Sequence, residues 1–317
     1  MLTDNLKGKV VIIGAGNVGS TIAYTTVLNN VASEVVIIDV NKEKAKGEAL
    51  DMNHGIAYVK QIMIRDGDYS DCKDADVIII TAGLGRKPGQ TRLDLAKINV
   101  NIAKDIAKNI MKYATNPILL VVSNPVDIIT YVLTKETGLP PERVIGTGTT
   151  LDTSRFKYLI SKHCDIDVRN VHASIIGEHG DSEVPVWSRA NIAGKPFDDF
   201  LDASPEVAEA QRNKIFEETK TAGAEIISLK GATFYAIAMG TVRILTAIIG
   251  NEQSVLTVSS VLDGEYGIKD IALSLPCVVN SSGISRKVDI QITKEEEVLL
   301  MASAEQLKDV LKQAYIQ

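Results

Sequence analysis

The chain has 317 residues and a formal net charge of −6 at pH 7, with 45% of its residues hydrophobic and 23% charged. Chains longer than about 250 residues usually divide into more than one core, so we expect two domains. The mild negative charge and the lack of a basic run disfavour a nucleic-acid binder that works by neutralising phosphates.

Three further patterns bear on location and metal content. Residues 1–9 lack the charged stretch, apolar core and small-residue cleavage site of a secretory signal. The most apolar window, residues 235–250, is interrupted by polar residues and is too short to span a bilayer. The scattered cysteines form no CxxC pair: Cys72, Cys164 and Cys277. We therefore expect a cytoplasmic protein with reduced thiols, no metal site and no membrane partner.

In the first half of the chain, runs rich in valine and isoleucine alternate with amphipathic segments of helical length. The predicted strands are residues 9–13, 34–38, 76–81 and 118–123. The predicted helices are residues 20–30, 42–53 and 93–113. Runs that are apolar at every position are typical of strands buried on both faces of a parallel sheet. The alternation predicts an α/β fold, a Rossmann-type doubly wound parallel sheet over residues 1–147.

The sequence pattern of the second half is different, because helical periodicity dominates it. Residues 168–176 and 287–292 are predicted strands, and the predicted helices are residues 206–229, 232–250 and 294–314. The pattern predicts a mixed α+β domain over residues 148–317. Because no repeat or long linker separates the halves, we expect them to pack closely.

The first predicted strand leads directly into a glycine-rich turn, residues 14–19, that opens a predicted helix. Glycines at this spacing allow a tight turn, close approach of the backbone to a pyrophosphate and close helix–strand packing. The second strand ends in Asp39, whose carboxylate suits ribose hydroxyls and would repel a 2′-phosphate. NAD is therefore favoured over NADP, although the nearby Lys42 leaves NADP open. The expected cofactor contacts in the turn are Gly14, Gly16, Asn17, Val18 and Gly19.

A histidine is suited to giving and taking the proton that accompanies hydride transfer, because its pKa lies near neutrality. The four histidines are His54, His163, His172 and His179. His179 stands in a glycine-flanked turn that follows a predicted strand, where a side chain can reach a cleft. A purely structural histidine is the alternative at this point.

Five motifs stand in order along the chain: GAGNVG, AGLGRKPGQTRLDL, VSNPVD, LDTSRF and IGEHGDS. Together they resemble the L-lactate/malate dehydrogenase family, from Val10 to the final helix. The resemblance is nearer to the bacterial L-lactate branch, because the malate branch more often carries glycine where Glu178 stands. It implies an NAD-dependent dehydrogenase of small 2-hydroxy acids.

The resemblance also implies a role for each site residue. His179 would donate the proton to the substrate carbonyl, and Asp152 would hold the other imidazole nitrogen. Arg155 would grip the substrate carboxylate, Arg92 would polarise the carbonyl from a mobile loop, and Asn124 would bind substrate or nicotinamide. The alternatives are a helix N-cap for Asp152 and solvated surface charges for the two arginines.

The positions that the resemblance links to the choice of substrate acid point to different substrates. By the same resemblance, Arg86 stands where malate enzymes carry arginine and lactate enzymes glutamine, and Gln90 also leaves the loop more positive than a monocarboxylate needs. Thr233 matches lactate enzymes. Arg86 facing a methyl group would be a costly unpaired charge, unless it turns outward to solvent. We expect an L-lactate dehydrogenase, with malate or dual activity as the alternative.

Regulation and assembly are implied only by the resemblance. His172 matches a histidine that binds fructose 1,6-bisphosphate between subunits in many bacterial relatives, but Lys157 stands where they have arginine. Lysine attracts phosphate without the two-pronged geometry of arginine. A homo-oligomer, tetramer or dimer, is expected. A non-enzymatic nucleotide-binding module, or a metal-dependent enzyme of the same fold, would not need His179, Asp152, Arg155 and Arg92 in this register.

Overall fold

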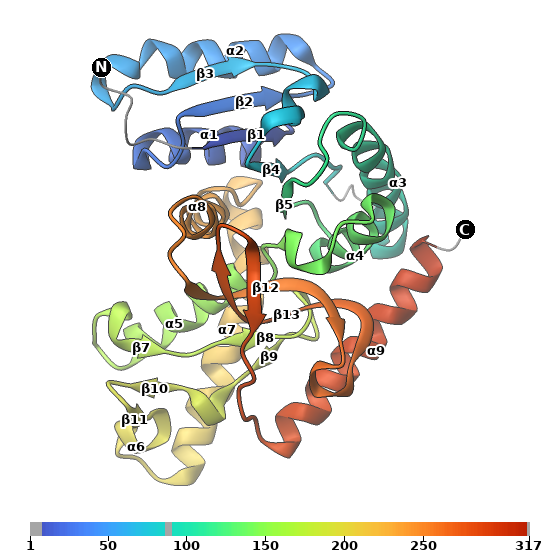
Figure 1. The fold of residues 1–317 in the computed structure, drawn as a ribbon. Helices are drawn as coiled ribbons and strands as arrows, with labels where there is room; N and C mark the ends of the chain where they lie inside the picture. The colour runs from blue at the N-terminus through green and yellow to red at the C-terminus, as the bar shows by residue number, and fades with distance from the viewer. Residues whose placement is uncertain (1–7, 86–90, 316–317) are drawn as a thin grey trace.

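The computed structural model describes residues 8–85 and 91–315. Within these ranges the largest sheet has nine strands in the order β14-β13-β12-β6-β5-β4-β1-β2-β3. Figure 1 shows the first-half strands at the top of the molecule and the second-half strands below them. One sheet therefore runs through both halves of the chain.

The first six strands are parallel and follow the order 3-2-1-4-5-6, the doubly wound pattern that the sequence predicts. They are β1 Lys9–Ile13, β2 Glu34–Ile38, β3 Met63–Asp66, β4 Val77–Ile80, β5 Ile118–Val121 and β6 Val144–Gly146. The central strands β4 and β5 are buried at every residue. The fold class is confirmed, although β3 and β6 were not predicted: β3 has only one buried residue in four, and β6 has only three residues.

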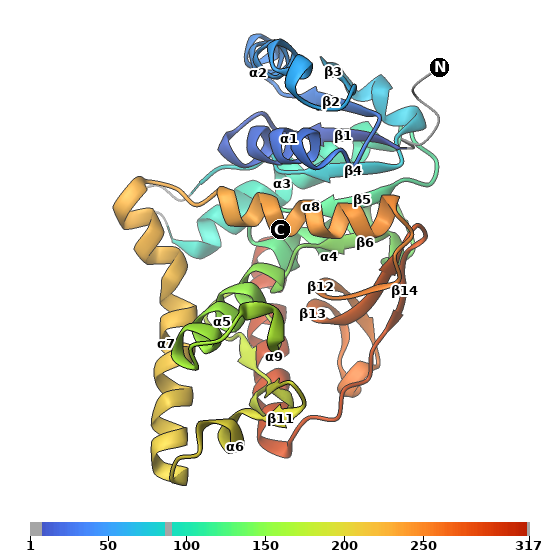
Figure 2. The same ribbon diagram turned by 90° about the vertical axis from the view of Figure 1, so that its left-hand side faces the viewer.

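Four helices connect these strands: α1 Asn17–Asn29, α2 Lys42–His54, α3 Arg92–Ile110 and α4 Val126–Thr137. Of these, α4 was not predicted. Helices α3, α4 and α9 (Lys294–Tyr315) contact one another, while α1 packs against α8 (Tyr235–Ile249). Figure 2 shows α8 running across the middle of the molecule beneath α1. The two halves are thus joined by helix packing as well as by the sheet.

The second half extends the sheet with antiparallel strands and adds two small sheets. The extension is β12 Ser254–Asp263, β13 Lys269–Asn280 and β14 Gly283–Lys287, with Ser259 of β12 paired to Gly146 of β6. The small sheets contain β7 Val171–His172, β10 Asn191–Ile192 and β11 Lys195–Pro196, and β8 Ile175–Ile176 with β9 Val184–Pro185. The other helices are α5 Thr150–His163, α6 Phe197–Leu201 and α7 Pro205–Lys230.

Two strand predictions in this half need correction. Residues 168–176 form a 3₁₀ turn, Val168–Asn170, followed by β7 and β8, each of two residues. The predicted strand 287–292 is wrong, because β14 ends at Lys287 and the sheet's last hydrogen bond here runs from the Val288 N–H to the Pro276 carbonyl at 2.7 Å. Among the described residues, no helix has both the length and the apolar character of a membrane span.

The central strand β4 gives a test of how much its burial contributes to stability. Ile79 is fully buried between Ile12 of β1 and Leu120 of β5. Ile79→Ala should lower the free energy of unfolding by about 3 kcal/mol, since it removes buried methyl groups and leaves a cavity. The measurement is the denaturant midpoint at fixed protein concentration. Val298→Ala, at a residue 58% exposed on α9, should change it little; equal losses would contradict this reading.

Candidate functional site

The glycine-rich turn has a backbone that other residues cannot replace. Gly14 has φ of +114°, and a Cβ there would lie 2.5 Å from Thr81 Oγ1. A Cβ on Gly19 would lie 1.9 Å from the Gly14 carbonyl oxygen. Gly16 differs, because a Cβ would meet nothing within 4 Å. Gly14 and Gly19 therefore close the turn onto α1, whereas Gly16 leaves open space at the N-terminus of that helix. This geometry could form a cradle for a pyrophosphate.

Asp39 joins this turn to the end of β2. Its Oδ2 accepts a hydrogen bond from the Ala15 N–H at 2.6 Å, and its Oδ1 accepts one from the Asn41 N–H at 2.8 Å. The carboxylate stands on the wall of a cavity of about 490 Å³, together with Gly14, Lys42 and apolar residues of α3. This position fits recognition of a ribose, and the residues present therefore fit a dinucleotide.

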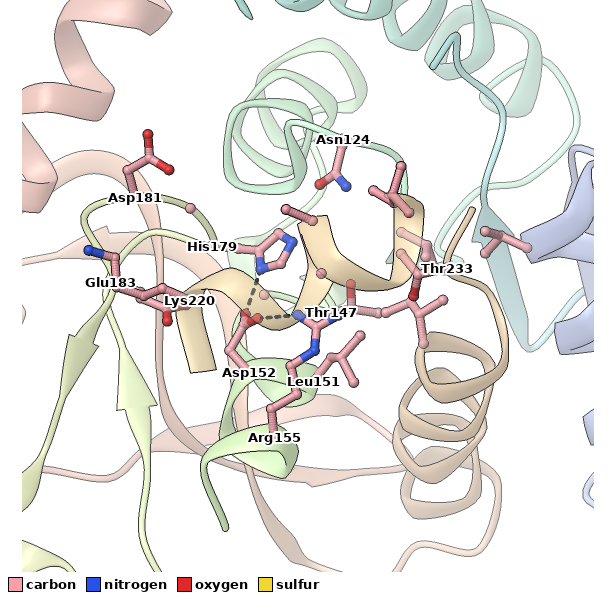
Figure 3. Close-up of a pocket in the computed structure, with 18 residues that line it drawn as sticks. Asn124, Thr147, Leu151, Asp152, Arg155, His179, Asp181, Glu183, Lys220 and Thr233 are labelled. Carbon is pink, nitrogen blue, oxygen red and sulfur yellow. Dashed lines mark hydrogen bonds and ion pairs between the residues drawn. The ribbon is translucent and has the colours of Figure 1, made fainter. Parts of the chain in front are cut away.

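A second cavity, of about 460 Å³, gathers most of the residues predicted for catalysis and substrate binding (Figure 3). Asn124, Asp152, Arg155, His179 and Thr233 all line it. Val18 of the glycine-rich turn lines it too, so the cavity adjoins the cofactor cradle. Residues that are far apart in the chain thus share one enclosure at the carboxyl end of the parallel strands.

Helix α5 positions the acid and the arginine of this cavity. Asp152 and Arg155 are three residues apart and therefore lie on one face of the helix. Asp152 is buried; its Oδ2 lies 2.5 Å from His179 Nδ1, and its Oδ1 accepts a hydrogen bond from Arg155 Nη1 at 3.0 Å. The N-cap of α5 is Thr149. Asp152 is therefore no N-cap, and Arg155 is ion-paired in the pocket wall rather than solvated.

The charges of this cluster depend on one another. The negative charge of Asp152 is the largest influence on His179 and raises its pKa to about 9, against the opposing effect of burial. Burial favours the neutral form of Asp152, but His179 and Arg155 outweigh burial and hold the pKa of Asp152 below its usual value. The imidazole therefore carries a proton at neutral pH, and its Nδ1 donates to the carboxylate.

Helix α7 closes the cavity beside Arg155. A Cβ on Gly223 would lie 3.4 Å from Arg155 Nη2, so a small residue on this helix lets the guanidinium fit. Lys220, one turn earlier, also lines the cavity. Asn124 follows β5 just before α4, where its Oδ1 accepts a hydrogen bond from the Val126 N–H at 3.2 Å. Thr233 lies between α7 and α8.

Sequence reasoning missed two acidic residues at this site. Glu183 lines the cavity; burial and then the negative charge of Asp152 raise its pKa to about 8. Asp127, on α4, accepts a hydrogen bond from the backbone N–H of His179. Asp127 stands within the VSNPVD motif, but its partner is 52 residues away in the chain, and spacing alone gives no signal for such a pair.

The remaining predicted residues fall into two groups, those outside the described part of the chain and those on other surfaces. Arg86 and Gln90 are outside the described residues, and Arg92 begins α3 but its side chain is also outside them. Lys157 is half-buried on a separate cavity of about 270 Å³, and burial lowers its pKa. His172 is exposed on β7. In the described part of the chain, no three His, Cys, Asp or Glu side chains are arranged to hold a metal ion.

A dinucleotide cradle beside a protonated histidine that is paired to a buried carboxylate, with an arginine facing the same cavity, defines a nicotinamide-dependent dehydrogenase. Residues 8–146 match the lactate/malate dehydrogenase NAD binding domain, and residues 149–316 match the alpha/beta C-terminal domain of the same family. The chain belongs to the lactate/malate dehydrogenase family, and its cofactor is NAD.

Relatives resemble the chain over nearly its whole length. An L-lactate dehydrogenase of Acetivibrio thermocellus is 52% identical over 98% of this chain and 99% of that protein. L-lactate dehydrogenase 1 of Clostridium acetobutylicum is 48% identical over 96% and 97%. The ligand-bound crystal structure of the minor L-lactate dehydrogenase from Enterococcus mundtii superposes with a TM-score of 0.94 at 45% identity, over 98% and 99% of the two chains.

Two alanine substitutions test separately whether a glycine is needed to close the turn and whether a glycine is needed to bind the cofactor. Gly19→Ala should lower both thermal stability and NADH affinity, since its Cβ collides with the Gly14 carbonyl. Gly16→Ala should leave stability unchanged but weaken NADH binding at least about tenfold, because its Cβ enters only the space intended for the pyrophosphate. Thermal denaturation and NADH fluorescence titration measure the two effects. Wild-type NADH affinity in Gly16→Ala would refute the assigned cradle.

Proposed function

We propose that the chain is an L-lactate dehydrogenase, which reduces pyruvate to L-lactate and runs in reverse. The observation that carries the proposal is the His179–Asp152–Arg155 cluster on a cavity that adjoins the NAD cradle. The relatives named as L-lactate dehydrogenases support the choice of acid.

NADH, held by the glycine-rich turn and Asp39, would supply the hydride for the C2 carbon of the keto acid. His179 gives its proton from Nε2 to the carbonyl oxygen, since Nδ1 is held by Asp152. In the reverse direction, neutral His179 takes the hydroxyl proton back. Asp152 fixes the ring and stabilises its charged form. Hydride and proton together convert the ketone to the alcohol, so charge and atoms balance.

Other residues of the chain bind and orient the acid. Arg155 faces the cavity with the guanidinium nitrogens that Asp152 does not hold, and pairs with the substrate carboxylate. Asn124 hydrogen-bonds substrate or nicotinamide at the end of β5. Thr233 narrows the space beside the substrate side chain. Arg92, at the start of α3, polarises the carbonyl in this proposal.

The choice of acid is tested by initial rates of NADH oxidation with pyruvate and with oxaloacetate. We expect pyruvate to be preferred. Arg86→Gln should raise the ratio of kcat/KM for pyruvate over oxaloacetate at least about tenfold, because it removes a cation that only a second carboxylate would pair. Arg169→Gln, at an exposed arginine paired with Asp167, is the matched control. Preference of the wild type for oxaloacetate would favour a malate dehydrogenase, and activity with neither would overturn the proposal.

We further propose a cytoplasmic homo-oligomer, tetramer or dimer, that responds to fructose 1,6-bisphosphate through Lys157 and His172. Lys157 supports this because its half-buried ammonium lines a cavity and has no ion-pair partner among the described side chains. Repeating the rate measurements with and without the bisphosphate tests the proposal, and equal rates would refute activation. Lys157→Gln should abolish any response.

The protonation of His179 sets the expected pH dependence. Pyruvate reduction needs the imidazolium, so kcat/KM should be constant below a pH of about 9 and fall above it. Asp152→Asn removes the charge that raises the pKa of His179, so the fall should begin at lower pH and kcat should drop by orders of magnitude. His179→Ala should lack turnover yet bind NADH. An unmoved pH profile in Asp152→Asn would contradict the assignment.

A further inference from the structure

The turn that carries His179 is held by three successive backbone amides, each bonded to a different element. The Gly177 N–H donates to the Ser274 carbonyl of β13 at 2.9 Å, and the Glu178 N–H donates to Ser303 Oγ of α9 at 3.0 Å. The His179 N–H donates to Asp127 Oδ2 of α4 at 2.8 Å. Of these three acceptors, only Asp127 is ionisable, and only Asp127 belongs to the NAD-binding half.

Asp127 is built into the interior as a charged acceptor. Its side chain is buried, with the residue 2% exposed, and its other oxygen, Oδ1, accepts a hydrogen bond from Ser259 Oγ of β12 at 2.6 Å. Both oxygens accept hydrogen bonds, which favour the carboxylate, but burial outweighs them and raises the pKa of Asp127 to about 6, so the group is ionised at neutral pH. Asp127 also lies in the first turn of α4, where the helix dipole favours a negative charge. A buried charge is costly without such partners.

We infer that Asp127 is a positioning residue for His179, which holds the proton donor in register with the nicotinamide side of the site. The reason is placement. Asp127 follows Asn124 by three residues, so the segment that reaches the cofactor side of the cavity also holds the backbone of the histidine on the other side. The inference rests on the proposed role of His179 as proton donor.

The carboxylate acts on His179 through charge as well as through geometry. The imidazole faces Asp152 and Arg155 of α5, Glu183 of its own segment and Asp127 of α4. Asp152 has the largest effect on the pKa of His179, and Asp127 acts in the same direction. The groups around Asp127 itself are His179, Glu178 and the Ser259 hydroxyl. Geometry and charge can therefore be separated by substitution.

The experiment compares Asp127→Asn with Asp127→Ala in the full-length protein. Asparagine can accept from the His179 N–H with its oxygen and donate to Ser259 Oγ with its amide, so it keeps both contacts and removes the charge. We expect Asp127→Asn to retain most of kcat, while the fall of kcat/KM for pyruvate begins at lower pH. Asp127→Ala should lose about a hundredfold in kcat, as misplacement by about an ångström does, with NADH affinity unchanged.

Glu296→Gln is the matched control, because Glu296 is also a buried carboxylate that bridges elements. It accepts hydrogen bonds from the Ser188 N–H and Oγ and from the Thr293 N–H, and does not line the cavity. This variant is expected to lose stability while its pH profile stays that of the wild type. A pH profile shifted equally in Glu296→Gln and Asp127→Asn would overturn the inference.

The outcome remains decisive when Asp127→Ala does not fold. An unshifted pH profile in Asp127→Asn would overturn the inference by itself. A merely structural role would lower stability and leave kcat, KM and the pH profile of the folded enzyme unchanged. His179→Ala, measured in the same series, separates failure of the proposed mechanism from failure of the inference about Asp127. If it stays active, the proposed mechanism fails; if it is inactive while the Asp127 variants behave as wild type, only the inference fails.

Discussion

The site depends on one buried carboxylate whose two oxygens both have charged partners. Asp152 meets His179 with one oxygen and Arg155 with the other, and burial of an unpaired charge would cost several kcal/mol. The carboxylate thus ties His179 and Arg155, the proposed proton donor and the proposed anchor of the substrate carboxylate, to one point on α5. Loss of either partner would leave the buried charge of Asp152 only partly compensated. A substitution of His179 or of Arg155 is therefore expected to affect both the proposed proton transfer and the proposed binding of the substrate carboxylate.

The continuous sheet explains how these groups meet. Strand β6 is the last parallel strand and β12 pairs with it, so the second half begins where the doubly wound part ends. The segment after β6 opens α5 at this junction, and close packing is required because a Cβ on Gly148 would lie 2.2 Å from Ser274 Oγ. The division of the chain at residue 147 stays a prediction, since one sheet crosses it.

The sequence predicted the first half well because its strands are apolar at every position. Strands β1 and β2 match the predicted residues, as buried parallel strands have a clear signal. Strands β12 and β13 were missed because serines interrupt their pattern: Ser259 and Ser274 are buried, each hydrogen-bonded to a distant residue. Periodicity treats such serines as exposed, and only the tertiary partners show why they are inside.

The candidate site was likewise predicted only in part. Motifs marked His179, Asp152, Arg155 and Asn124, and the structure brings them to one cavity, although their individual roles stay predictions. Nothing in the sequence marked Glu183, because its surroundings come from three elements. Arg86, the residue expected to bear most on the choice of acid, lies outside the described residues.

Two carboxyl groups near His179 have opposite states for a physical reason. Asp152 has a cation on each oxygen and stays ionised, whereas Oε1 of Glu183 is buried and has no hydrogen-bond partner among the residues that the structure describes. Burial is the larger reason that the pKa of Glu183 is raised to about 8, and the negative charge of Asp152 acts in the same direction, so the better-paired Asp152 keeps its charge while Glu183 is protonated at neutral pH. A neutral Glu183 does not compete with the substrate carboxylate for Arg155. The surroundings of each acid therefore set its charge, and a neutral Glu183 leaves Arg155 to pair with Asp152 and, as proposed, with the substrate carboxylate.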